Sequence, residues 1–266
     1  MREILALTRA QWLSQTSYRL QTILSFVSII VSVIPLYFVS DALQPVMENA
    51  IRDEGGQYFG FLVIGMVATL LLNASVQLMP TSMASNISRG TLEAMLSTPA
   101  HLTSILLGMI GAGIAWAFAR MAVLLAGGWV LGAPVQWGTM LPALLVLCLI
   151  MLAYLPFGII ASALILTFRT AGPIPQGVTY LSILLGGVYY PTHVIPSWLE
   201  SVSDFVPLTY GLRALRRIAL DGDSIGSVVP DLLVLIAFVV VLTIVASVCF
   251  AVAFRHAKRA GTIAQY

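Results

Sequence analysis

Arg120 is the one charged residue that lies deep within a long apolar segment of this sequence. At the centre of a lipid bilayer an unpaired arginine costs at least about 2.5 kcal/mol, so it needs water, carbonyl groups, a polar stripe or an anionic ligand nearby. No Asp or Glu occurs in the interior of any of the apolar segments. We expect Arg120 to meet an anionic group or a lipid headgroup on a path through the membrane. The alternatives are snorkelling and a hydrogen bond to another helix.

Thr69, Asn73 and Gln77 form a second candidate group, because residues spaced by four share one face of a helix. A polar face within an apolar helix lines a solute path, or it makes interhelical hydrogen bonds worth about 1 kcal/mol each. Both interpretations stay open for these three residues. A similar cluster of hydroxyl groups lies nearer the N-terminus, where we favour interhelical hydrogen bonds over a path: Thr22, Ser25, Ser28 and Ser32.

No nucleotide-hydrolysing motif accompanies these residues. A P-loop needs a glycine-rich turn followed by Lys and then Ser or Thr. The only lysine of the sequence, Lys258, stands between Ala257 and Arg259. We therefore expect that the chain is not an enzyme, that it binds no cofactor itself, and that any ATP hydrolysis that drives it takes place on another polypeptide.

The histidines and cysteines are not spaced for metal binding. His101 and His193 lie at the edges of apolar segments and His256 lies in a basic tail, each without a second ligand-type residue at ligand spacing. We expect them to be interfacial residues. Cys148 and Cys249 both lie inside apolar runs, which predicts packed, inert thiols and no disulfide framework.

Composition identifies the class of protein that must position these residues. Hydrophobic residues make up 59% of the chain, charged residues only 9%, and the mean hydropathy is +0.97; soluble domains have about 25% charged residues. The net charge of +2 argues against a nucleic-acid partner. Six segments reach or approach the roughly 20 apolar residues that cross a bilayer. These predicted spans are Thr22–Ser40, Phe59–Pro80, Leu102–Gly132, Thr139–Phe168, Pro173–Tyr190 and Pro230–Phe254.

The predicted fold is therefore all-α: a polytopic membrane protein with six transmembrane helices, forming a single domain over residues 1–266. Leu102–Gly132 is longer than one straight crossing needs, so it is tilted or broken near Gly108, Gly111 and Gly113. Residues 1–21 mix apolar and basic side chains as an interfacial helix on the membrane surface does, the alternative being a disordered terminus.

The positive-inside rule predicts the orientation. Basic residues gather before the first span, after the second and fourth spans, and after the last: Arg2, Arg9, Arg19, Arg89, Arg169, Arg255, Lys258 and Arg259. The loop from Asp41 to Tyr58 is mainly acidic. Both termini are therefore expected in the cytoplasm, although three arginines then lie outside: Arg213, Arg216 and Arg217.

Residues 81–101 form a polar insert between the second and third spans, which this orientation places in the cytoplasm. One apolar edge has the i, i+3, i+4 spacing of a short helix: Leu92, Met95 and Leu96. Gly90 permits a turn into the helix, Glu93 suits its first turns, and Pro99 marks its end. The pattern fits a docking helix for a soluble partner, and it fits a simple connection as well.

Residues 191–229 precede the last span and face outside in this topology. Ser197 and Glu200 have the spacing of a capping box for a helix that runs to about Phe205. Pro207 then permits a second helix with an apolar stripe: Leu208, Leu212, Leu215 and Ala219. We expect two short helices at the outer leaflet, able to seal the exit of a path. A compatible alternative is a solvated loop whose arginines pair with nearby acids: Glu200, Asp204, Asp221 and Asp223.

The run from Arg89 to Pro99 closely resembles the cytoplasmic coupling segment of ABC-2 type transporter permeases. Gly186–Pro191, Ile195–Leu199 and Pro207–Arg213 resemble later segments of the same family. The resemblance covers nearly the whole chain, in length, number of spans and placement of both loops. It is nearer to the drug-export branch than to the polysaccharide-export branch.

The resemblance implies roles for named residues. The coupling segment docks on a separate ATPase subunit, which binds ATP and Mg²⁺, through Arg89, Gly90, Thr91, Leu92, Glu93, Met95 and Leu96. The loop before the last span forms a re-entrant outer hairpin whose gate residues are Tyr190, Pro191, Trp198, Pro207, Tyr210 and Arg213. A second copy or a paralogue completes the dimer in the inner (plasma) membrane, where lipid surrounds it.

The expected function is that of the membrane subunit of an ATP-driven exporter for a hydrophobic or amphipathic substrate. The alternatives are export of a lipid-linked polysaccharide or glycolipid, and secondary transport. Secondary transport fits less well, because secondary transporters usually carry ionisable residues in their spans and often inverted repeats. A membrane-embedded enzyme would need catalytic groups that converge at membrane depth, and the spans offer only Arg120 and isolated cysteines.

Overall fold

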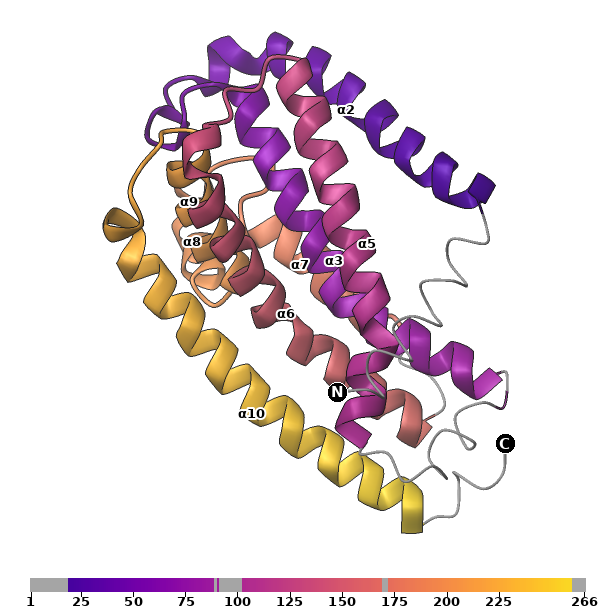
Figure 1. Cartoon of the computed structure of the whole chain (residues 1–266). Helices are drawn as coiled ribbons and strands as arrows, with labels where there is room; N and C mark the ends of the chain where they lie inside the picture. Colours follow the sequence, from indigo (N-terminus) through magenta and orange to yellow (C-terminus); the bar gives the residue numbers. More distant parts are fainter. Residues whose placement is uncertain (1–18, 89, 91–101, 169–171, 260–266) are drawn as a thin grey trace.

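The computed structural model describes residues 19–88, 90, 102–168 and 172–259, and the regular structure in these ranges is helical, with no strand. Five of the described helices are long and apolar enough to cross a membrane. The chain is thus an all-α polytopic membrane protein, as predicted. Figure 1 shows the long helices arranged as an elongated bundle.

The centre of the bundle consists of α3 (Tyr58–Ser88), α5 (Leu102–Val130) and α6 (Met140–Phe168). α3 packs against both of the others, and 72% of its most apolar window is buried. Small residues allow close approach between these helices, as is usual in membranes. A Cβ atom on Gly128 would lie 2.6 Å from the Val63 side chain, and one on Gly158 would lie 2.7 Å from the carbonyl oxygen of Ser75.

Two helices flank this centre with little burial of their own. α2 (Arg19–Met47) packs on α3 and α5, while α10 (Val229–Arg259) packs on α6 and α9 (Pro207–Ala219). They lie on opposite sides of the bundle in Figure 1. Only 6% and 17% of their apolar windows are buried, so most of their apolar surface faces outward.

The two ends of the bundle carry different elements. At one end the turn after α2, including the 3₁₀ helix η1 (Arg52–Glu54), contacts α9. We call this the hairpin end, and the end at which α3 reaches Ser88 the insert end. α3 continues through Pro80, where the predicted span stopped, because a membrane helix tolerates proline when its neighbours stabilise it.

The predicted span Pro173–Tyr190 is helical over only part of its length. α7 (Ile174–Leu185) has 12 residues, which is about 18 Å at 1.5 Å per residue. Crossing the hydrocarbon takes about 30 Å. The helix ends at the glycine pair Gly186 and Gly187, the second of which has φ +75°. A count of six full spans therefore stays a prediction, with five found in the described residues.

The predicted loop 191–229 contains four short helices. They are η3 (Thr192–Val194), α8 (Ser197–Ser203), α9 and η4 (Ile225–Val228). Pro207 begins α9, as its position predicted. The predicted capping box is wrong: Pro196 takes the N-cap position of α8, so Ser197 is already within the helix and makes no capping hydrogen bond.

Other predictions have mixed outcomes. α5 is one continuous helix, so the suggested break near Gly108 is wrong. Cys249 is exposed on α10, which contradicts the prediction of a packed thiol there, while Cys148 is half-buried. The predicted interfacial helix at residues 1–21 lies outside the described residues up to residue 18; α2 begins at Arg19.

Candidate functional site

A half-open pocket of about 360 Å³ lies between α3 and α5. Among the described residues, four polar and three apolar side chains line it: Asn73, Gln77, Thr81, Arg120, Leu70, Ala74 and Leu78. All of them except Thr81, which is exposed, are half-buried. The structure thus brings Arg120, predicted on one helix, together with Asn73 and Gln77, predicted on another.

The hydrogen bonds around this pocket leave polar groups available to a ligand. The Asn73 amide donates to the Thr69 carbonyl oxygen at 3.1 Å, within α3. The Gln77 side chain makes no hydrogen bond within the described part of the chain. Arg120 donates from Nε to the carbonyl oxygen of Trp116 at 3.3 Å, one turn back on α5. Its terminal nitrogens form no ion pair with any described acid.

Thr69, the third residue of the predicted polar face, does not line the pocket. Its hydroxyl donates to the Gly65 carbonyl oxygen at 2.9 Å, within the same helix. Thr81 takes its place in the lining. Sequence reasoning missed Thr81, although it continues the same spacing of four beyond Gln77.

Three serines of the predicted hydroxyl cluster on α2 do not donate to other described helices, contrary to the prediction. Ser25, Ser28 and Ser32 each donate to a carbonyl oxygen three residues earlier in α2, at 2.7–2.9 Å. A serine within a helix reaches its own preceding turn without a partner helix. The hydroxyl groups of these three serines therefore donate within α2 and not to another described helix.

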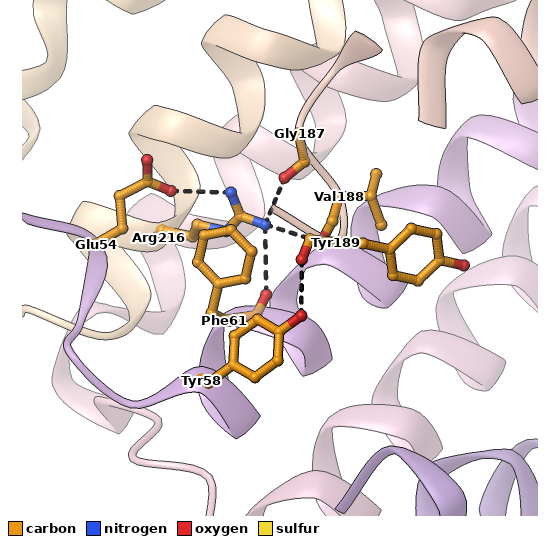
Figure 2. A network of polar contacts seen from close by, with 7 residues as sticks. All are labelled: Glu54, Tyr58, Phe61, Gly187, Val188, Tyr189 and Arg216. Atoms are coloured by element: carbon orange, nitrogen blue, oxygen red, sulfur yellow. Dashed lines mark hydrogen bonds and ion pairs between the residues drawn. The ribbon is translucent and has the colours of Figure 1, made fainter. Parts of the chain in front are cut away.

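Arg216 organises the hairpin end (Figure 2). Its Nη1 donates to the Glu54 carboxylate at 2.9 Å, and Nη2 lies 2.9 Å and 3.1 Å from the carbonyl oxygens of Gly187 and Val188. A longer contact of 3.4 Å reaches the Phe61 carbonyl oxygen. One side chain of α9 therefore holds the turn after α2, the first turns of α3 and the chain segment after α7.

The Arg216–Glu54 ion pair is largely buried. The Arg216 side chain is 2% exposed and Glu54 is 17% exposed. The guanidinium carbon lies 3.3 Å from the centre of the Phe61 ring, in a cation–π arrangement. Burial lowers the pKa of Arg216 to about 10, and the Glu54 carboxylate opposes that shift. The side chain stays charged at neutral pH.

Of the three arginines on α9, only one forms an ion pair with an acid of the predicted loop 191–229. Arg217 binds the Asp223 carboxylate at 2.8 Å, as predicted. Arg213 instead contacts Asp231 of α10 at 3.4 Å, and Arg216 contacts Glu54, 162 residues away in the sequence. Arg216 lies four residues after Leu212, at the edge of the apolar stripe, and this spacing was the available signal that it is buried.

The other predicted gate residues occupy different positions at the hairpin end. The Tyr190 hydroxyl donates to the Leu184 carbonyl oxygen, and Pro191 is buried beside it in the sequence. Trp198 is 68% exposed on α8. Pro207 is buried, and the Tyr210 ring lies 6.1 Å from that of Phe238 on α10. No single site contains them all.

Gly90 is the one predicted coupling residue that the structure describes. Its φ of +67° is a left-handed conformation that glycine adopts readily, and its amide donates to the Ile87 carbonyl oxygen at 2.9 Å. Gly90 therefore forms a turn two residues after the end of α3, which agrees with the predicted turn at this glycine. The remaining predicted coupling residues lie outside the described residues: Arg89, Thr91, Leu92, Glu93, Met95 and Leu96.

No cluster of three or more His, Cys, Asp or Glu side chains that could hold a metal ion occurs among the described residues. The candidate sites are thus the pocket between α3 and α5 and the Arg216 network. The first offers charge and hydrogen bonds to a ligand, and the second holds elements together.

Comparison with known proteins identifies the family. The profile of ABC-2 type transporters matches residues 2–220. Nodulation protein J of Rhizobium leguminosarum bv. trifolii is 30% identical over 173 residues, which is 64% of this chain and 64% of the relative. Nodulation protein J of Rhizobium meliloti (strain 1021) is 28% identical over 173 residues, with the same 64% shares. The probable multidrug ABC transporter permease YbhS of Escherichia coli (strain K12) is 26% identical over 179 residues, covering 66% of this chain and 47% of the relative.

The matched region spans less than two thirds of the length of these relatives. The family profile, in contrast, covers most of this chain, and the long apolar helices agree with a membrane-embedded family. The chain belongs to the ABC-2 type transporter family.

Proposed function

We propose that this chain is the membrane-spanning permease subunit of an ATP-driven exporter for a hydrophobic or amphipathic substrate. The observation that carries the proposal is a polar pocket on α3, the helix that ends at Ser88, directly before the run from Arg89 to Pro99 that resembles the family's coupling segment. A displacement of that segment acts on the helix that holds six of the seven described lining residues.

In this proposal Asn73, Gln77 and Arg120 line part of the substrate path, with Thr69 one turn away on α3. A separate ATPase subunit binds ATP and Mg²⁺ and docks on residues 81–101. The chain forms one domain over residues 1–266, lies in the inner membrane with both termini in the cytoplasm, and pairs with a second copy or a paralogue. The outward apolar faces of α2 and α10 are available for that pairing and for lipid.

The hairpin end acts as the outer gate of the proposed path. α8 and α9 lie there, with an exposed apolar edge on α8 and the following turn: Trp198, Val202 and Phe205. The Arg216 network holds α9 against α3, so the gate moves with the outer part of the bundle.

Export of a lipid-linked polysaccharide or glycolipid is the second candidate. The amides of Asn73 and Gln77 favour it, because an amide can donate to and accept from sugar hydroxyl groups. Transport of a neutral glycolipid and of an apolar drug by the same preparation would separate the two candidates.

The test is affinity purification of the tagged full chain in mild detergent, with ATPase activity measured on the eluate. We expect a P-loop ATPase to co-purify with the wild type and to be lost from Glu93→Arg. The matched control is Glu200→Arg, the same charge reversal on α8 at the other end of the bundle. A chain that purifies alone and still moves solute in liposomes would refute the ABC mechanism in favour of secondary transport.

A further inference from the structure

We propose that the pocket between α3 and α5 binds the phosphate-class anionic headgroup of an amphiphile, with Arg120 as its charge partner. The inference rests on the proposed function only where it identifies this amphiphile with the transported substrate. Binding itself is a property of the pocket and can be measured on the chain alone.

The first argument is that the charge of Arg120 has no counter-charge among the described residues. Arg120 lies within the span Gly111–Val130, and its single hydrogen bond to a described residue is a long one to a backbone carbonyl of its own helix. A guanidinium whose terminal nitrogens form no ion pair with a described acid is suited to bind a phosphate through two parallel hydrogen bonds. An anion in the pocket supplies the counter-charge that the described residues do not.

The second argument is the convergence of hydrogen-bonding groups. Gln77 and Thr81 stand on the same face of α3 as Asn73, and all three line the pocket opposite Arg120 on α5. Phosphate oxygens accept hydrogen bonds from amide and hydroxyl donors as well as from arginine. The polar half of the lining thus offers donors to several oxygens of one anionic group.

The third argument is the division of the lining into polar and apolar parts. Leu70, Ala74 and Leu78 form the apolar part, along the same stretch of α3. The volume of 360 Å³ accommodates a headgroup but leaves no room for two acyl chains as well; small-molecule pockets typically measure about 300–1,000 Å³. Because most of the lining is only half-buried, the chains of the amphiphile can extend from the open side into the surrounding lipid.

The experiment measures lipid binding to the purified full chain in detergent by native mass spectrometry. The probes are phosphatidylglycerol and a phosphate-free glycosyl diacylglycerol with identical acyl chains. We expect wild type to prefer phosphatidylglycerol, and Arg120→Gln to weaken its binding about tenfold, since one charge-assisted contact is lost. Arg120→Lys keeps the charge and retains the preference. Gln77→Leu weakens binding of both lipids while it retains the preference.

Arg217→Gln is the matched control, because it removes an arginine that lies on α9 and not in the pocket. An unchanged preference in Arg120→Gln, or equal binding of both lipids by wild type, would overturn the proposal. Competition by inorganic phosphate identifies the anionic group alone as the ligand, and resistance to it identifies the whole lipid; each supports the pocket. The lipid-binding measurement does not depend on co-purification of an ATPase. Failure of the proposed function can therefore be distinguished from failure of the proposed lipid site.

Discussion

Replacement of Arg216 by glutamine is expected to be far more destabilising than the same replacement at Arg217, its neighbour. Arg216 is 2% exposed and Arg217 is 34% exposed, and each pairs with one carboxylate at 2.8–2.9 Å. The two variants remove the same charge from adjacent positions of α9. The two variants differ in how deeply the replaced arginine is buried and in how many acceptor groups lose their hydrogen-bond donor.

The structure sets the expected magnitudes. Without Arg216, the Glu54 carboxylate keeps its charge with only 17% exposure, and the carbonyl oxygens of Gly187 and Val188 lose their donor. Removing one partner of a buried ion pair costs about 3–5 kcal/mol. The Arg217 pair is partly solvated, and such pairs contribute about 0–1 kcal/mol.

The assay is unfolding of the full chain in detergent micelles by sodium dodecyl sulfate, followed by circular dichroism. Equal losses in the two variants, or a loss below about 1 kcal/mol for Arg216→Gln, would show that the network is not a buried structural pair. Glu54→Gln combined with Arg216→Gln removes the uncompensated charge, so we expect the double variant to be more stable than the sum of the single losses indicates.

Three further outcomes test other parts of the structure. Gly65→Ala would place a methyl group 2.6 Å from the Val188 carbonyl oxygen, so we expect a loss of more than about 1 kcal/mol in the same unfolding assay; a neutral effect would contradict the close approach. Tyr58→Phe removes the 2.8 Å hydrogen bond from its hydroxyl to the Tyr189 carbonyl oxygen and should cost about 1 kcal/mol, with no change in secondary structure by circular dichroism. Cys249 should stay unlabelled by a charged maleimide in sealed vesicles, because it is exposed on a membrane-facing helix that this reagent does not reach; rapid labelling would place water there.

Hydropathy was sufficient to predict the long helices because their composition alone makes them membrane-spanning. α6 and α10 begin and end within a few residues of the predicted segments, apart from the last turns of α10. The predicted segment Pro173–Tyr190 is longer than α7, because apolar character continues through Gly186 and Gly187 although the helix does not. Hydropathy records which residues prefer lipid, and it does not record where a glycine pair ends a helix.

For the polar residues too, local properties could be predicted from the sequence and contacts between distant segments could not. Asn73 and Gln77 could be grouped from their spacing, and Arg120 from its isolation, since these are local properties of the sequence. That they share one pocket depends on how α3 packs against α5, through contacts such as that of Gly113 with Leu78. The partner of Arg216 could not be predicted either, because nothing local connects it with an acid 162 residues away.

Pro80 lies in α3 between two residues that line the pocket, Gln77 and Thr81. Proline has no amide hydrogen, so the Val76 carbonyl lacks its usual helical partner and bending is easiest there. The segment from Thr81 to Ser88 is about 12 Å long, at 1.5 Å per residue. A displacement of this segment would move Thr81 relative to Gln77, and would so change the shape of the pocket.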